Sequence, residues 1–386
     1  MSSTVANAVR KPLQVRAPRR FLFLFGVPHA FAVTLTVALY HALGGAAWVT
    51  LLPAIWFYVI IPILDFLIGE DETVPPEDEY KRLEADRFYT NLIFAILPVY
   101  LLNFALGIML LVDGLPLWAA IPFMFSFGLG AGQVLVYAHE LGHRTNNLDR
   151  QMAKFALSII GYGHFCIEHN RGHHVHVATP EDCASARMNE TVYGFMFRDI
   201  IGAFRRGWMH EAKRLRNKKL PVFSHHNEIL QSYAVTLVFA AAMIAWLGWV
   251  ALPFIVLHHY LGWFALTVVN YIEHYGLKRE KLPNGRYEPC KPYHSWNTNH
   301  VVSNIVTINL QRHSDHHANP ARPYQCLRNF DELPRLPSGY PGCITMALVP
   351  PVWFAVMNPR VRAWCATFAD GDESKLNWGF REAPAT

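Results

Sequence analysis

The stretch FLFLFGVPHAFAVTLTVALYHAL at residues 21–43, followed by AAWVTLLPAIWFYVIIPILDFLI at residues 46–68, decides the kind of fold. No Lys or Arg occurs between Arg20 and Lys81. A helix that crosses the hydrocarbon core of a bilayer needs about 20 apolar residues in a row, and each stretch meets that length. The sequence therefore predicts an integral membrane protein.

The composition of the whole chain agrees with this prediction. Of 386 residues, 52% are hydrophobic and only 16% are charged, whereas a soluble domain carries about 25% charged residues. The first apolar stretch is too long for the core of a signal peptide, and no small-residue cleavage site follows it, so we expect no signal peptide. We expect the protein to lie in a lipid bilayer and to bind no nucleic acid.

Four more apolar stretches complete the pattern, and no internal repeat is evident. We predict an all-α integral membrane protein with six transmembrane helices and a histidine-rich, di-metal catalytic region on the cytoplasmic side. The predicted spans are residues 21–43, 46–68, 90–112, 115–139, 232–249 and 251–275.

Positive charge sets the expected orientation of these spans. The arm at residues 1–20 and the loop at 69–89 contain Lys and Arg, whereas the connections after spans one, three and five contain none. By the positive-inside rule the arm and the loop are cytoplasmic, and so are both termini. The chain is thus divided into a basic cytoplasmic arm, four spans, a cytoplasmic region, two spans and a cytoplasmic C-terminal region, at residues 1–20, 21–139, 140–231, 232–275 and 276–386.

Nine histidines gather at or just beyond the predicted inner ends of spans four and six. Imidazole is a good ligand for iron, copper, zinc and nickel, and nine rings exceed what one ion can bind. The pattern therefore predicts a two-metal centre beside the membrane. The nine are His139 and His143 in HELGHR, His169, His173 and His174 in EHNRGHH, His274 in NYIEHYGL, and His313, His316 and His317 in LQRHSDHH.

The spacing within each cluster says which rings can meet. Four residues between two histidines place them on one face of a helix, which predicts that His139 pairs with His143 and that His169 pairs with His173. An adjacent pair such as His173 and His174 can bind two different metals. Imidazoles bound to metal usually donate their other N–H to a carboxylate, and direct ligation by a carboxylate is the alternative. The carboxylates within or beside the clusters are Glu140, Glu168, Glu273 and Asp315.

The segment His139–His143 also matches HExxH, in which two histidines bind zinc and the glutamate is the general base of a protease. A zinc protease needs one more ligand and an open position for water. Seven further clustered histidines are not explained by one zinc ion. An intramembrane zinc protease is therefore the less favoured alternative.

Four motifs, HELGHR, EHNRGHH, NYIEHYGL and LQRHSDHHAN, resemble those of the membrane-bound alkane 1-monooxygenases. The histidine spacings alone are shared with membrane desaturases and related hydroxylases, whereas NYIEHYGL and LQRHSDHH are similar to the alkane branch. The similarity covers roughly residues 50–345, through GYGHFCIEHN, VATPED, KPYHSWNTNHVVSN and LPSGYPG. Two positions depart from the pattern, since Arg144 stands where Lys is common and Cys183 where Pro is common.

This resemblance implies a chemistry for the chain. It implies that the nine histidines bind two non-haem iron ions in the inner membrane of a bacterium. One oxygen atom of O2 would enter the terminal methyl of a medium-chain n-alkane, giving a primary alcohol. The two electrons would come from rubredoxin, which an NADH-dependent reductase reduces. A xylene-type or fatty-acyl hydroxylase or a desaturase with the same metals is the alternative.

The six cysteines form no CxxC pair, so no rubredoxin-type iron site is expected within this sequence, and the thiols are expected to stay reduced. An alkane gains about 0.8 kcal/mol per CH2 on leaving water and would reach the metals through a pocket lined by spans one to four. We predict that Trp56 and Phe57 limit the chain length there. The basic stretch at 197–220 is predicted to lie on anionic lipid headgroups, with docking of an acidic electron carrier as the alternative.

Overall fold

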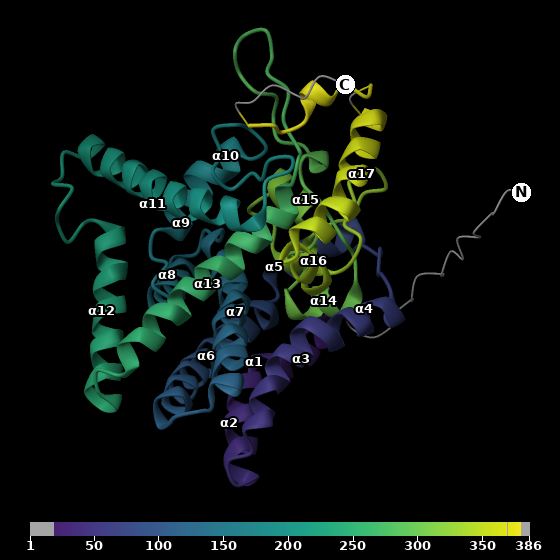
Figure 1. Ribbon diagram of the computed structural model, residues 1–386. Helices are drawn as coiled ribbons and strands as arrows, with labels where there is room; N and C mark the ends of the chain where they lie inside the picture. Colours follow the sequence, from purple (N-terminus) through teal and green to yellow (C-terminus); the bar gives the residue numbers. More distant parts are fainter. Residues whose placement is uncertain (1–18, 369, 380–386) are drawn as a thin grey trace, which may run out of the picture.

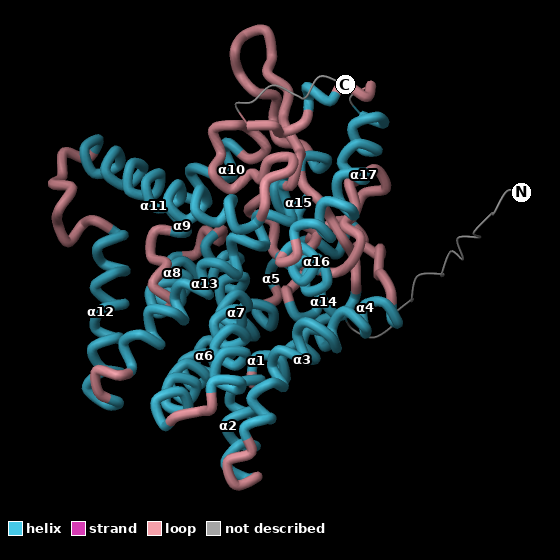
Figure 2. The backbone as a smooth tube through the Cα atoms, viewed as in Figure 1, coloured by secondary structure: helices cyan, strands magenta, loops and turns pink. Residues whose placement is uncertain are grey.

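The computed structural model describes residues 19–368 and 370–379, so most of the predicted basic arm at 1–20 lies outside the described residues. Within these ranges the protein is helical, and β-structure is limited to three isolated bridges. Long helices fill one end of the molecule, and loops gather at the other end around α10 (His174–His176) and α15 (His313–Ala318) (Figure 2). The predicted all-helical fold class is confirmed.

Five helices are long and apolar enough to cross a membrane, and the number rises to seven if each of two bent pairs forms one span. The protein is a multi-pass membrane protein, as predicted, and its six predicted spans correspond to these five helices and the first bent pair. The five are Ala47–Ile68, α6 (Arg87–Asp113), α7 (Leu117–Gly142), α12 (Glu228–Leu247) and α13 (Ala251–His274). The first of these is built from η2 (Ala47–Leu51), α3 (Leu52–Ile55), η3 (Trp56–Ile60) and α4 (Ile61–Ile68).

The first predicted span, 21–43, is a broken helix rather than a straight one. It consists of η1 (Arg19–Gly26), α1 (Val27–Ala30) and α2 (Ala32–Ala42), with a bend of 45°. Inside a bilayer the backbone groups freed by such a break need protein partners. Asn103 of α6 supplies them: its amide nitrogen donates to the Ala30 carbonyl, and its Oδ1 accepts from the backbone nitrogen of Thr34 at 2.9 Å.

Helices α7 and α13 lie closely side by side and carry the histidine site at their shared end (Figure 1). Small residues make the close approach possible, because a Cβ at Gly128 would overlap Leu261 and one at Gly132 would lie 3.0 Å from Ala265. Such seams of small residues are typical of helix packing in membranes, where backbones approach closely. The rigid pair fixes the position of His139 relative to His274.

The remaining elements lie at the loop-rich end or beside the membrane helices. Helix α11 runs across this end and then turns through a loop into α12 (Figure 1). It exposes Phe197 and Ile201 between basic residues, and its contact with lipid headgroups stays a prediction. The elements are η4 (Glu77–Glu79), α5 (Tyr80–Ala85), α8 (Asn147–Ile159), α9 (Phe165–Glu168), η5 (His169–His173), α11 (Val192–Asn217), η6 (Pro292–His294), α14 (Val301–Val306), η7 (Tyr324–Cys326), α16 (Tyr340–Ala347), α17 (Pro350–Phe368) and η8 (Glu373–Lys375).

Helices α16 and α17 form the second bent pair, with an angle of 119° between them. Cys343, Trp353 and Met357 are each fully buried, so one face of the pair packs on the rest of the protein. Helix α16 lies against α13 and brings Tyr340 to the histidine site.

Candidate metal centre

The structure brings all nine predicted histidines together in two adjoining groups. The five-histidine group consists of His139, His143, His169, His174 and His316, and the four-histidine group consists of His173, His274, His313 and His317. One ring nitrogen of each residue faces the others of its group, and within a group these nitrogens all lie within 4.8 Å of one another. Histidines from four separate parts of the sequence thus converge at one end of the helical bundle.

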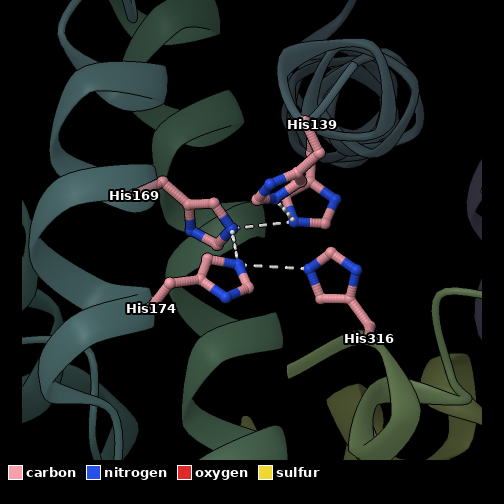
Figure 3. Close-up of side chains that lie close together, drawn as sticks. His139, His169, His174 and His316 are labelled. Atoms are coloured by element: carbon pink, nitrogen blue, oxygen red, sulfur yellow. Dashed lines mark hydrogen bonds between the residues drawn. The ribbon is translucent and has the colours of Figure 1, made fainter. Parts of the chain in front are cut away.

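In the five-histidine group the facing atoms are Nε2 nitrogens. The Nε2 atoms of His139 and His169 are 2.8 Å apart, and those of His169 and His174 are 3.0 Å apart (Figure 3). His316 reaches in from α15 and lies 3.2 Å from His174, also between Nε2 atoms. The predicted pairing of His139 with His143 is confirmed, since their Nε2 atoms are 3.2 Å apart at the end of α7.

The predicted pairing of His169 with His173 is corrected by the local backbone. Residues His169–His173 form a π-helical turn, which has hydrogen bonds from residue i to i+5 and more residues per turn than an α-helix. His169 therefore pairs with His174, and His173 turns toward the other group. The wider turn directs two adjacent histidines to two different groups, as the sequence analysis expects for His173 and His174.

A second adjacent pair is divided in the same way. In the short helix α15, His313 and His317 are four residues apart and their Nε2 atoms are 2.9 Å apart within the four-histidine group. His316 points to the five-histidine group instead. The rings of His174 and His317, from different groups, have centroids 4.5 Å apart. The two groups are therefore close neighbours that share two chain segments.

The close approach of the HELGH segment to α9 depends on Gly142. A Cβ at this position would lie 2.6 Å from the sulfur of Cys166, so any larger residue would push the end of α7 away from the segment that contains His169. Gly142 is therefore needed for the close packing of α7 against the segment that contains Cys166.

These geometries fit metal ions. Two nitrogens that each lie about 2.1 Å from one ion at a right angle are about 3.0 Å apart, which is close to the observed separations of the Nε2 atoms. Burial lowers the pKa of His143, His169 and His174 well below the ordinary value, and the neighbouring rings lower it further. The pKa values of His313, His316 and His317 are lowered for the same reasons. Neutral imidazole is the form that binds metal.

Asp182 is a site residue that the sequence analysis did not single out. Its Oδ2 lies 2.9 Å from Nδ1 of His173 and also accepts a hydrogen bond from Ser185. Burial alone would lower the pKa of His173, but the Asp182 carboxylate raises it above the ordinary value. With Nδ1 bound to Asp182, Nε2 of His173 has no hydrogen-bond partner in the described structure and is directed at its group. Asp182 lies in the VATPED stretch, but no spacing rule connects it to His173.

Glu273 is the predicted carboxylate that does contact a histidine. Its Oε2 lies 3.1 Å from Nε2 of His313, the nitrogen that faces the four-histidine group. Its Oε1 accepts a hydrogen bond of 2.6 Å from the hydroxyl of Tyr340 on α16. Tyr340 belongs to the LPSGYPG stretch and is a second residue that sequence spacing could not connect to the site.

The other three predicted carboxylates bind arginines. Glu140 accepts from Arg144 at 2.6 Å, Glu168 lies 3.3 Å from Arg206, and Asp315 is bound by Arg322 and Arg328. Arg206 also lies 3.2 Å from Asp182. Burial raises the pKa of Glu168 to about 8, although Arg206 opposes the shift. These ion pairs hold α11 and the loops around the histidines.

The two groups differ in access to solvent. All four members of the four-histidine group are buried, whereas His143 and His174 of the five-histidine group are partly exposed. Water therefore reaches the edge of one group and is kept from the other.

Two adjoining cavities, which share part of their lining, lie among the membrane helices beside the site. The proximal cavity reaches Val269 of α13 and Tyr340 of α16, and the distal cavity extends to Tyr100 and Asn103 of α6. Both are mainly apolar. The residues that line both cavities are His29, Phe57, Tyr58, Leu129, Gly130 and Gln133.

The two residues predicted to limit chain length occupy different positions. Phe57 lines both cavities and stacks on the ring of His29. Trp56 is not among the lining residues, and its indole nitrogen donates to Nδ1 of His29 at 3.0 Å. Trp56 thus contacts the cavity lining through its hydrogen bond to His29.

Comparison with known proteins agrees with this arrangement. Residues 116–345, more than half of the chain, match the family model described as fatty acid desaturase. The chain is 43% identical to alkane 1-monooxygenase 1 of Alcanivorax borkumensis, over 93% of this chain and 88% of that protein. It is 45% identical to alkane 1-monooxygenase of Pseudomonas putida, over 86% and 82%, and 28% identical to the xylene/toluene monooxygenase hydroxylase component of Pseudomonas putida, over 63% and 64%. The chain therefore belongs to the alkane 1-monooxygenase family of oxidoreductases, within the broader fatty acid desaturase family.

Proposed function

We propose that this protein hydroxylates medium-chain n-alkanes at the terminal methyl, using O2 and giving primary alcohols. The observation that carries the proposal is the connection between cavity and site. The proximal cavity is lined by Tyr340, whose hydroxyl donates to Glu273, and Glu273 lies against His313. An apolar chain in this cavity would have one end beside the four-histidine group. The names of the relatives support the choice of alkanes.

The nine histidines would hold two non-haem iron ions, one in each group. Bound iron would supply the capacity to activate O2 and to oxidise a C–H bond. Asp182 fixes the ring of His173 by accepting from Nδ1, and this keeps Nε2 directed at the four-histidine group. The hydroxyl of Tyr340 holds a proton against Oε1 of Glu273, which fixes this carboxyl beside His313.

The buried surroundings have a role of their own. All four residues of the four-histidine group are buried, so a methyl group beside them would be kept from bulk water. Exclusion of water strengthens electrostatic interactions and prevents side reactions of reactive species. The apolar lining from Val136 to Val269 positions a hydrocarbon by burial alone, because an alkane offers no polar group to bind.

We further propose that the two electrons come from rubredoxin, reduced by its NADH-dependent reductase, on the cytoplasmic face of a bacterial inner membrane. The partly exposed rings of His143 and His174 support this part of the proposal. They bring the five-histidine group to the protein surface at the loop-rich end. A soluble donor could approach there without entering the membrane.

The deciding experiment supplies the iron-loaded protein with n-octane, O2, NADH, rubredoxin and the reductase. We expect 1-octanol, and its absence would refute the proposed function. His225→Ala is a matched control because His225 is exposed on a loop away from both groups, and this variant should keep full activity. Analysis of the bound metal separates the alternatives, since an intramembrane protease would contain one zinc ion.

The relationship to the xylene/toluene enzyme and to the desaturase family gives a second candidate function. The same assay distinguishes it from alkane hydroxylation. Conversion of xylene at a higher kcat/KM than n-octane would favour a xylene-type hydroxylase. A dehydrogenated chain without added oxygen would favour a desaturase.

A further inference from the structure

One arginine of α11 joins two buried carboxylates behind the histidine groups. The Nε of Arg206 lies 3.3 Å from Glu168, and its Nη1 lies 3.2 Å from Asp182. The arginine side chain is 16% exposed, and the side chains of Glu168 and Asp182 are 4% and 0% exposed. A buried charge is costly unless it is paired, so removal of the arginine would leave both carboxylates in an unfavourable state.

These carboxylates belong to a cluster that has the composition of a metal site. The ligand atoms of Glu168, Asp182 and Cys183 all lie within 4.8 Å of one another, and all three residues are buried. The Nη1 of Arg206 is also 3.8 Å from the sulfur of Cys183. The guanidinium group thus provides at this position the positive charge that a metal ion would otherwise provide.

The two carboxylates hold opposite ends of the π-helical turn at His169–His173. Glu168 comes directly before the turn, and Oδ2 of Asp182 lies 2.9 Å from Nδ1 of His173, the last residue of the turn. The other oxygen of Asp182, Oδ1, accepts a hydrogen bond from Arg206. Arg206 therefore connects both ends of the turn through one planar, rigid group.

Gly172, inside the turn, makes room for this connection. A Cβ at Gly172 would overlap Oε1 of Glu168 and would lie 2.8 Å from Nη2 of Arg206. Even an alanine at this position would force the carboxylate or the guanidinium group to move. The small residue in the turn and the arginine on α11 thus belong to one packing arrangement.

The shape of this turn decides which histidine joins which group. In α-helical geometry residues four apart lie on one face, so His169 and His173 would face the same group. The π-helical turn instead directs His173 to the four-histidine group and His174 to the five-histidine group. Turns of this kind are rare and are frequent at functional sites. The division of the histidines therefore depends on the contacts that keep the turn π-helical.

We propose that Arg206 is the positioning residue that keeps this turn π-helical and thereby fixes the division of the histidines between the two groups. It holds Glu168 at the start of the turn and, through Asp182, holds His173 at the end. Without the arginine the segment relaxes toward α-helical geometry, and His173 leaves the four-histidine group. This inference rests on the proposed function in one respect, which is the identity of the bound metal as iron.

The test measures the metal bound per chain in the full-length protein. Arg206→Gln removes the charge, and the iron content should fall from two toward one per chain, because three histidines remain in the group that His173 leaves. The affinity for the second iron should fall about ten- to a hundredfold, as for other groups that support a metal ligand. Gly172→Ala should reproduce this loss. Arg206→Lys should restore only part of the affinity, because an ammonium group lacks the fork geometry of guanidinium.

Cobalt(II) in place of iron shows which group is affected, without any need for activity. The visible absorption of this ion depends on the number and geometry of its ligands, and four and five histidines should give different bands. In Arg206→Gln the band of the four-histidine group should be lost and that of the five-histidine group kept. Loss of the other band, or of both bands together, would overturn the inference.

Added guanidinium ion separates a positioning role from a general loss of stability. In Arg206→Ala, guanidinium at low millimolar concentration should enter the space of the missing side chain and raise the metal content toward two per chain. Urea has a similar shape but no charge, and it should give no rescue. Failure of guanidinium to restore any metal would contradict the inference, and so would equal rescue by urea.

Arg214→Gln is the matched control, because Arg214 lies on the same helix, is 18% exposed and is paired with the buried Glu211. This variant should lower the unfolding temperature and keep two metals per chain. Equal metal loss in Arg214→Gln and Arg206→Gln would overturn the inference, because the loss would then follow from destabilisation of α11. Two metals bound with unchanged affinity in Arg206→Gln would overturn it as well. A wild type that binds two irons but forms no 1-octanol would instead refute the proposed function.

Discussion

The two histidine groups are built from the same side chain but are supported differently. The four-histidine group is buried, and carboxylates contact two of its members, with Asp182 at His173 and Glu273 at His313. The five-histidine group has more rings, two of them partly exposed, and the hydrogen bonds of its facing nitrogens run from ring to ring. The four-histidine group is therefore oriented by carboxylates inside the protein. The five-histidine group is oriented by contacts between its own rings and lies partly at the surface. Under the proposed function, we expect the four-histidine group to act on the substrate and the five-histidine group to receive electrons from the donor.

The largest expected effect comes from the loss of one ligand in each group. His274→Ala leaves three histidines in its group, whereas His143→Ala leaves four. Both variants should lose alkane hydroxylation by at least about a hundredfold, because even partners of metal ligands contribute 10- to 100-fold. We expect His274→Ala to bind one iron per chain and His143→Ala to retain part of the second, as measured by metal analysis. Equal metal loss would show that the number of rings does not distinguish the groups.

A smaller effect is expected from the carboxylate that supports the buried group. Asp182→Asn removes the negative charge beside His173 and should lower metal affinity about tenfold, with activity falling in parallel at limiting iron. Glu211→Gln is the control, because Glu211 is as buried but is paired with Arg214 on α11. It should lower the unfolding temperature without changing metal affinity. The same iron affinity for Asp182→Asn and the wild type, measured by titration, would contradict the view that carboxylates support the four-histidine group.

Removal of the metal should proceed in two steps. A chelator reaches the five-histidine group through the exposed edges of His143 and His174, whereas the four-histidine group is covered. We expect release of about one iron per chain in a fast phase and the second more slowly. Release of both irons in one phase would indicate that the groups open together.

The sequence predicted the members of the site better than their arrangement. Hydropathy and charge showed the membrane helices, and the clusters named all nine converging histidines. The division into five and four could not be predicted, because it depends on the π-helical turn at His169–His173 and on the short helix α15. Helical periodicity assumes α-geometry, and so it paired His169 with the wrong neighbour.

Two further features depended on contacts between distant segments. Asp182 and Tyr340 reach the site through the folding of loops and of α16 onto α13, and no local spacing reports such contacts. The break in the first span depends on Asn103, which lies on another helix. Pro28 is the local sign of that break, but a proline in the first turn of a helix is also tolerated without one.

The smallest expected effect concerns the cavity and not the metals. Phe57 lines both cavities, so Phe57→Ser should open the wall and shift the preferred n-alkane to longer chains by a few carbons. Trp56→Ser should shift it less, because Trp56 does not line either cavity and donates a hydrogen bond to His29, which does. Gas chromatography of the alcohols formed from an alkane mixture would measure both shifts, with metal content as the internal control. Because none of the nine histidines lines the cavities, these variants should change the preferred substrate and leave both irons bound. An unchanged product profile would show that the cavity does not hold the reacting alkane. Loss of iron would show that the cavity wall also stabilises the metal centre.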